Sequence, residues 1–238
     1  MLSVTTKSGI YNGYKVIGTQ TLGLRGLVLW LKFNEGSGNI AYDSSFYNNH
    51  STIYGAVWTD GKFGKALSFD GVDDYVEVPN TSDFHPNALT ISVWVYPKPV
   101  SNLRGIVDKG GWHPTNKDGE WSVSWLSSNK FQLHFYTSEQ ELVCLTSPAY
   151  EPEHWHHVVA VWNGSVLKLY VNNELVSSAE LPSLNQQTYN INIGRTQRYV
   201  RYFNGTIDEV RIYSRALSEN EIKMLYYNRI GAVPSKTI

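Results

Sequence analysis

The chain has 238 residues, of which 42% are hydrophobic and 17% charged, with a formal net charge of -1. This near-neutral balance gives no basic surface for a phosphate backbone, which argues against nucleic acid as a partner. No apolar run approaches the roughly 18 residues that a membrane span needs, and the N-terminus has no signal-peptide pattern, so we expect no membrane insertion and no export signal. Because Cys144 is the single cysteine, no intrachain disulfide can form.

Period-2 alternation of apolar residues is the strongest structural signal in the chain. It begins at Leu27, Leu29 and Leu31 and returns at short intervals, separated by turn sequences such as Asp-Gly and Asn-Gly. With 16 Tyr, 8 Trp and 19 Gly, the composition also favours strands and turns over helices. We therefore predict an all-β fold, a two-sheet antiparallel jelly-roll sandwich, with strands at 27–34, 52–58, 65–70, 74–78, 89–96, 120–126, 130–137, 141–146, 155–162, 166–171, 174–179, 189–194 and 206–213.

A short C-terminal helix should follow the last strand. Ser218 and Glu221 have the spacing of a capping box, and Ile222, Leu225 and Tyr226 then fall on one face. The residues before the first strand are polar and lack a sustained period, and the last residues contain Pro and small polar side chains. We expect an N-terminal arm at 1–25, one sandwich domain at 26–230 and a tail at 231–238.

Six segments resemble the laminin G-like jelly roll of the concanavalin A-like lectin/glucanase superfamily, and they occur in the family's order. They are GLVLWLKFNEGSGNIAYDSS, GKFGKALSFDGVDDYVEVP, LTISVWVYP, WHHVVAVWNGSVLKLYVNNELV, NINIGR and FNGTIDEVRIYSRALSENEI. The resemblance covers about residues 26 to 228. It implies two curved antiparallel sheets, often a calcium ion, and frequent attachment to secreted or surface proteins that bind glycans or other proteins.

Asp208 is the most informative polar residue of these motifs. It has the parity of Val210 and Ile212, so it should point toward the interior, where an acid is costly unless a cation or several donors satisfy it. Calcium takes six to eight oxygen ligands, and hydrogen bonds to turn amides are the alternative. With the resemblance, this favours a structural Ca2+ at Asp208, with further ligands from nearby turns at Asn34, Glu35, Asp43 and Asp70.

Candidate sugar contacts gather in two loops. Aromatic rings can stack on the apolar face of a sugar, while amide, carboxylate and guanidinium groups bind its hydroxyls. The alternative is that these residues form ordinary polar loops and cover the edge of the sandwich. The candidates are Trp112, His113, Asn116 and Asp118 in one loop, and Arg195, Arg198, Tyr199 and Arg201 in the other.

Catalytic patterns of the superfamily are missing. Its glucanases place carboxylates at alternate positions of one strand, where they can flank a glycosidic bond, and no such Glu-x-Asp-x-Glu run occurs here. The set of a polysaccharide lyase is not reproduced either. We therefore expect no enzymatic activity, and regard a glycoside hydrolase or lyase as the weaker alternative.

The sequence thus predicts a noncatalytic recognition module that binds a carbohydrate or glycoprotein and is stabilised by structural calcium. We expect it to act outside the cell, at a cell surface or on a virion. The alternative is a structural or adhesion subunit of a virion or cell-surface assembly, whose N-terminal arm contacts neighbouring subunits. Fold alone does not decide between them.

Overall fold

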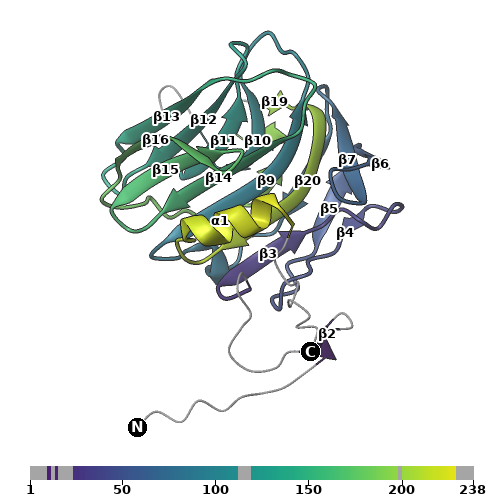
Figure 1. The fold of residues 1–238 in the computed structure, drawn as a ribbon, viewed down its shortest axis with the longest axis horizontal. Helices are drawn as coiled ribbons and strands as arrows, with labels where there is room; N and C mark the ends of the chain where they lie inside the picture. Colours follow the sequence, from purple (N-terminus) through teal and green to yellow (C-terminus); the bar gives the residue numbers. More distant parts are fainter. Residues whose placement is uncertain (1–9, 12–13, 16–23, 112–118, 198–199, 229–238) are drawn as a thin grey trace, which may run out of the picture.

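The computed structural model describes residues 10–11, 14–15, 24–111, 119–197 and 200–228. Two large antiparallel sheets face each other and α1 lies across one of them (Figure 1). In spatial order, the first sheet contains β13 (Leu142–Ala149), β12 (Lys130–Tyr136), β11 (Trp121–Trp125), β10 (Arg104–Lys109), β17 (Ile191–Ile193), β8 (Tyr75–Val78), β5 (Ser51–Tyr54) and β4 (Ile40–Ala41).

The second sheet contains β16 (Glu174–Glu180), β15 (Val166–Val171), β14 (His156–Trp162), β9 (Leu89–Pro97), β20 (Asn204–Tyr213), β7 (Lys65–Asp70) and β6 (Val57–Asp60), while β3 (Leu27–Leu31) also pairs with β20. The small elements are the pairs β1 (Ile10–Tyr11) with β2 (Tyr14–Lys15) and β18 (Arg195–Thr196) with β19 (Arg201–Tyr202), the 3-10 helix η1 (Ser82–Phe84) and α1 (Glu219–Tyr226). The predicted all-β sandwich with a C-terminal helix is confirmed.

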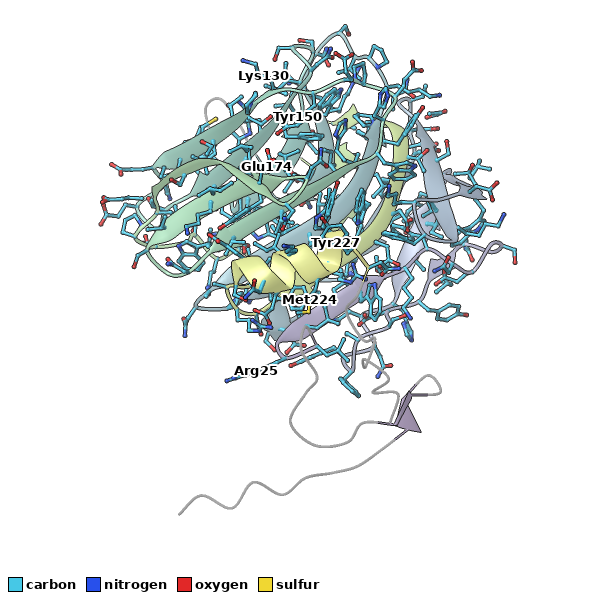
Figure 2. The ribbon with its side chains drawn as sticks, in the orientation of Figure 1. Arg25, Lys130, Tyr150, Glu174, Met224 and Tyr227 are labelled. Atoms are coloured by element: carbon cyan, nitrogen blue, oxygen red, sulfur yellow. The ribbon has the colours of Figure 1, made fainter. Side chains whose placement is uncertain are left out.

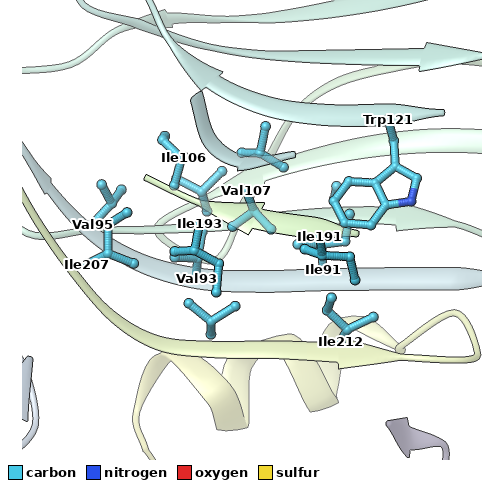
Figure 3. Packing of buried hydrophobic residues seen from close by; sticks show 14 of the residues in the cluster. Ile91, Val93, Val95, Ile106, Val107, Trp121, Ile191, Ile193, Ile207 and Ile212 are labelled. Carbon is cyan, nitrogen blue, oxygen red and sulfur yellow. The ribbon is translucent and has the colours of Figure 1, made fainter. Parts of the chain in front are cut away.

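The core lies between the two sheets and is built from the inward residues of each strand. Figure 3 shows Ile91, Val93 and Ile207 of the second sheet packed against Ile193 and Trp121 of the first. All of these side chains are fully buried. Because successive strand residues point to opposite faces, the residues between them must lie on the outer faces of the sandwich.

Helix α1 covers the outer face of the second sheet. Ile222 and Leu225 pack on Val159 and Tyr213 in a second apolar cluster. Ser218 accepts a hydrogen bond from the amide of Glu221, whose side chain reaches back to the N-cap amide, so the predicted capping box is confirmed. In the part of the chain that the structure describes, no helix is long and apolar enough to cross a bilayer.

Two strand predictions were wrong in detail. The segment predicted as one strand at 52–58 is two strands that belong to different sheets, because Gly55 has a φ of +77° and turns the chain between β5 and β6. Strand β10 was not predicted, since its sequence RGIVDK shows little alternation. It nevertheless lies in the middle of the first sheet.

Two neighbouring residues of β12 test this arrangement. Leu133 is fully buried in the core, whereas Gln132 faces outward. Leu133→Ala should lower the free energy of unfolding by about 2–5 kcal/mol because it leaves a cavity, and Gln132→Ala by less than about 1 kcal/mol. Urea denaturation measures both. Equal losses would contradict the assignment of the two faces.

Candidate carbohydrate-binding face

The outer face of the first sheet carries a row of polar side chains. Cross-strand pairing joins Glu77 to Asn192, Asn192 to Asp108, Asp108 to Ser122 and Ser122 to His134. Directly paired residues point to the same side of a sheet, so these five residues, here called the polar face, lie side by side across five strands. Asp108, Ser122 and Asn192 are almost completely buried.

This row was present in the sequence as a pattern of polar residues at alternate strand positions. In β11, the tryptophans and Val123 point into the core and Ser122 points outward, and in β12 Leu133 points inward and His134 outward. The alternation predicted the strands. It did not show that strands distant in sequence would align their outward residues, because strand order is a tertiary property.

Three stacked side chains lie at one end of the polar face. The rings of Tyr54 and Tyr75 are parallel within 13°, with centroids 4.5 Å apart, and the guanidinium carbon of Arg195 lies 3.4 Å from the Tyr75 centroid. Tyr54 and Arg195 must occupy opposite faces of the Tyr75 ring, because on one face they would overlap. We call these three residues the aromatic stack. Tyr54 is 41% exposed and is its outer member.

Arg195 connects the aromatic stack to the polar face. Its Nε donates a hydrogen bond to Asn192 Oδ1 at 2.9 Å, and its Nη2 lies 3.7 Å from Glu77 Oε2. These contacts orient the planar guanidinium over Tyr75, where cation–π attraction adds to the hydrogen bond. The aromatic stack thus joins an exposed ring at one end to a guanidinium and a carboxylate at the other, the kinds of group that bind sugars.

Two of the predicted sugar-binding residues lie in the described part of the chain. Arg195 is part of the aromatic stack, and Arg201 lies opposite Thr196 in the β18–β19 hairpin. Sequence reasoning missed Tyr54, Tyr75 and Glu77, which come from strands far from residue 195 in the chain. The remaining candidates lie outside the described residues: Trp112, His113, Asn116, Asp118, Arg198 and Tyr199.

Asp208 is buried as predicted, but on the other side of its strand. A β-bulge between Asp208 and Arg211, with Glu209 at a φ of +54°, breaks the parity that the sequence suggested. Ile207 and Val210 face the core, whereas Asp208 pairs with Trp94 on the outer side of the second sheet. The expectation that Asp208 points between the sheets was therefore wrong, because a bulge shifts every residue after it to the other face.

Asp208 and Asn34 meet at the turn between β6 and β7. Asp208 Oδ2 accepts from the amide of Phe63 at 2.9 Å, and Asn34 Oδ1 accepts from the amide of Lys65 at 2.7 Å. Asp208 Oδ1 is buried without a hydrogen-bond partner, and burial raises the pKa of this carboxyl to about 7. A Cβ on Gly61 would lie 2.6 Å from the Lys65 carbonyl oxygen and 2.7 Å from Asp208 Oδ2. Carboxylate, amide and carbonyl oxygens thus converge here, which fits the oxygen ligands that calcium takes.

Two other predicted metal ligands, Asp43 and Glu35, accept hydrogen bonds from backbone amides. Asp43 accepts hydrogen bonds at both oxygens, from the amides of Trp30 and Ser45 at Oδ1 and of Asn49 at Oδ2, so it shapes its own loop. Glu35 Oε1 accepts from the amide of Tyr42. Asp43 thus has a structural role without a metal, whereas Glu35 Oε2 is buried without a hydrogen-bond partner among the described residues.

Asp70 belongs to a separate acidic group. Its carboxylate lies within 4.8 Å of those of Asp73 and Asp74, and the three together could hold a metal ion. Asp74 is buried, and its Oδ2 accepts from the amide of Asp70. Burial raises the pKa of Asp74, and the negative charges of Asp70 and Asp73 add to this effect. The group lies at the opposite end of β7 from the turn that Asp208 contacts.

The arrangement of strands has a counterpart among known families. A family model described as the concanavalin A-like lectin/glucanases superfamily (Laminin_G_3) matches residues 70–223. The chain belongs to this superfamily. The match includes most of the strands and the residues Asp70 and Asp208, and it bears out the resemblance that the sequence motifs indicated.

Solved structures with similar folds share little sequence with this superfamily member. The binding domain of Paraclostridial Mosquitocidal Protein 1 has a TM-score of 0.69 and 16% identity, covering 85% of this chain and 52% of that one. Domain 4 of AbnA, a GH43 extracellular arabinanase from Geobacillus stearothermophilus in complex with arabinotriose, has a TM-score of 0.63 and 19% identity, covering 84% and 98%. At such identities the likeness shows the fold alone.

Among curated proteins, adhesion G-protein coupled receptor D1 of Homo sapiens is 30% identical over 111 residues, which is 44% of this chain and 13% of the receptor. The binding domain of botulinum neurotoxin DC in complex with SialylT has a TM-score of 0.67 and 16% identity, covering 87% of this chain and 52% of that one. The chain thus spans about half of the toxin domains and a small part of the receptor. Structural neighbours include a domain solved with arabinotriose and the receptor binding domain of a botulinum neurotoxin C/D mosaic serotype.

The buried histidine of the polar face gives a simple test of its environment. Burial lowers the pKa of His134 to about 4, so the ring should stay neutral across physiological pH. We expect its imidazole NMR signal, assigned by comparison with His134→Gln, to be constant from pH 5.5 to 8. A midpoint near 6.5, the unperturbed value, would show that the ring is solvated.

Proposed function

We propose that this protein is a noncatalytic recognition module that binds a carbohydrate or glycoprotein, at a surface outside the cell, through the aromatic stack and the neighbouring Glu77. The aromatic stack is the observation that carries the proposal. The outer face of Tyr54 offers an apolar platform for the C–H face of a pyranose, while Arg195 and Glu77, at the other end of the aromatic stack, supply groups that bind hydroxyls.

The fold neighbours support this class of ligand. One of them was solved with arabinotriose, one with SialylT and one with rat synaptotagmin II. These ligands belong to those proteins. For this chain they make glycan and glycoprotein the first ligands to test, and the aromatic stack indicates where such a ligand would contact the surface.

A noncatalytic role is favoured by the state of the carboxylates on the polar face. Glycoside hydrolysis needs two carboxyl groups that reach one glycosidic bond from either side. Asp108 is completely buried, and its Oδ1 is already bound by two backbone amides, so it is poorly placed to reach a substrate. The side chain of Glu77 is 31% exposed and could reach a substrate, but Asp108 cannot act as the second carboxyl group of a hydrolase.

Substitutions in the aromatic stack should weaken ligand binding. We expect Tyr54→Ala to lower affinity about tenfold and Arg195→Ala about ten- to a hundredfold, since each removes contacts of about 1–3 kcal/mol. A glycan array followed by calorimetry on the best ligand measures this. Tyr227→Ala is the matched control, because Tyr227 is 52% exposed but follows α1 on the other layer (Figure 2). Equal affinity of the wild type and both stack variants would place the ligand elsewhere.

We also propose that the turn at residues 61–65 binds a structural calcium ion through Asp208, Asn34 and the Lys65 carbonyl. The unpartnered Oδ1 of Asp208 supports this proposal, because a buried carboxylate oxygen without a donor is costly and a cation would satisfy it. The ion would join β20 to the loop after β3 and to the turn before β7. Its role would be to stabilise the sandwich.

Thermal melting in calcium and in EDTA tests this site. We expect calcium to raise the melting temperature of the wild type, with about 2.7 kcal/mol of stabilisation at a hundredfold excess over its dissociation constant. Asp208→Asn should abolish the calcium effect and melt no lower than the wild type in EDTA, because it removes an unpaired buried charge.

Two further variants locate the ion. Asp43→Asn should keep the calcium response, since the hydrogen bonds of Asp43 account for its role. If Asp73→Asn loses the response while Asp208→Asn keeps it, the ion lies in the group of Asp70, Asp73 and Asp74. A wild-type melting temperature that is the same in calcium and EDTA would refute structural calcium altogether.

A further inference from the structure

One buried carboxylate ties the β18–β19 hairpin to the first sheet. Asp108 Oδ1 accepts two hydrogen bonds, from the amide of Gly111 at 3.2 Å and from the amide of Gln197 at 3.0 Å. Gly111 follows β10, on which Asp108 lies, while Gln197 directly follows β18. Asp108 therefore fixes one end of the hairpin to the centre of the polar face.

The hairpin also lies directly on β10 at a second point. A Cβ on Gly105 would be 2.5 Å from the backbone carbon of Arg195 and from the nitrogen of Thr196, so only glycine leaves room for this contact. Arg195 is the first residue of β18 and carries its guanidinium onto the Tyr75 ring. The position of the hairpin thus decides whether the aromatic stack forms.

We propose that Asp108 is a positioning residue for the binding face, which in its protonated form holds the β18–β19 hairpin closed so that Arg195 stacks on Tyr75. This inference rests on the proposed function. Asp108 does not touch the ligand. It acts through the amide of Gln197 and the backbone of Arg195, and loss of its proton loosens the hairpin.

The surroundings of Asp108 explain why the neutral form fits. Oδ2 is buried and has no hydrogen-bond partner in the described part of the chain. Burial raises the pKa of Asp108 to about 7, although the amides of Gln197 and Gly111, the hydroxyl of Ser122 and the charge of Arg195 each lower it. A proton on Oδ2 leaves Oδ1 free to accept both amide hydrogens.

Among the described residues, the ionisable groups on the strands around Asp108 are neutral or positive, apart from Glu120, which forms a buried ion pair with Lys109. On β12, His134 stays uncharged above pH 5, since burial lowers its pKa to about 4. Glu77 lies two strands away, beyond Asn192, and pairs with Arg195. Arg104 is on the same strand and Arg201 lies on β19, so the remaining charges on these strands are positive. None of these groups supplies Oδ2 with a hydrogen bond.

The sign of the pH effect follows from the two states of the hairpin. When it is closed, Asp108 ionises near pH 7, and when it is open and solvated it ionises near the unperturbed value of about 3.9. Between these two pKa values the closed state binds more protons than the open state. The equilibrium constant for closing the hairpin therefore falls as the pH rises, by at most about tenfold per pH unit, and it levels off above pH 7.

Hydrogen exchange of the hairpin amides, corrected for intrinsic rates, tests without a ligand whether Asp108 holds the hairpin closed. We expect protection of β18–β19 in the wild type to fall by up to about a hundredfold from pH 5 to pH 7. Asp108→Asn keeps an acceptor oxygen but cannot ionise, so its protection should be retained and independent of pH. Asp108→Ala should lose protection at every pH, and Asp83→Asn should behave as the wild type.

Affinity for the best glycan should show the same dependence on pH and on the Asp108 variants as the hairpin protection, in the same buffers. Wild-type binding should weaken from pH 5 to pH 7, Asp108→Asn should bind equally at both, and Asp108→Ala should bind weakly throughout. Unchanged hairpin protection in Asp108→Ala, or identical pH profiles of wild type and Asp108→Asn, would overturn the proposal. If no glycan binds the wild type while the exchange results are as expected, the proposed function is wrong but the role of Asp108 in holding the hairpin is supported.

Discussion

Burial of one face of each sheet against the other governs where the polar side chains of this protein can lie. The inward positions form one large apolar cluster, so the alternate positions must face outward. Helix α1 and its apolar contacts occupy part of the outer face of the second sheet. The first sheet instead aligns Glu77, Asp108 and His134 with their neighbours in one row, whose backbone the core holds rigidly.

Much of the fold could be predicted because local alternation and turn residues agree with the tertiary structure. The capping box at Ser218 and the core strands were read correctly for this reason. The aromatic stack could not be predicted, since Tyr54, Tyr75 and Arg195 meet only through the strand order of the sheet. Strand alternation also could not predict the face to which Asp208 points, because a single extra residue in a β-bulge reverses that face.

The two proposed sites lie on different layers and would act independently. Asp208 and Asn34 connect the last strand of the second sheet to its neighbouring turn, whereas the aromatic stack belongs to the first sheet and its hairpin. A calcium ion at the first site would therefore influence ligand affinity only through the stability of the whole sandwich.

The contact between Gly105 and the hairpin divides the proposed binding surface into strands of the sheet and a hairpin that packs on them. The inward residues of these strands build the core, while the hairpin rests on β10 through backbone contacts and one carboxylate. Changes in the hairpin sequence would thus alter the proposed ligand contacts without disturbing the folding of the sandwich. This division gives the scaffold a route to new ligand preferences by natural variation or by loop grafting.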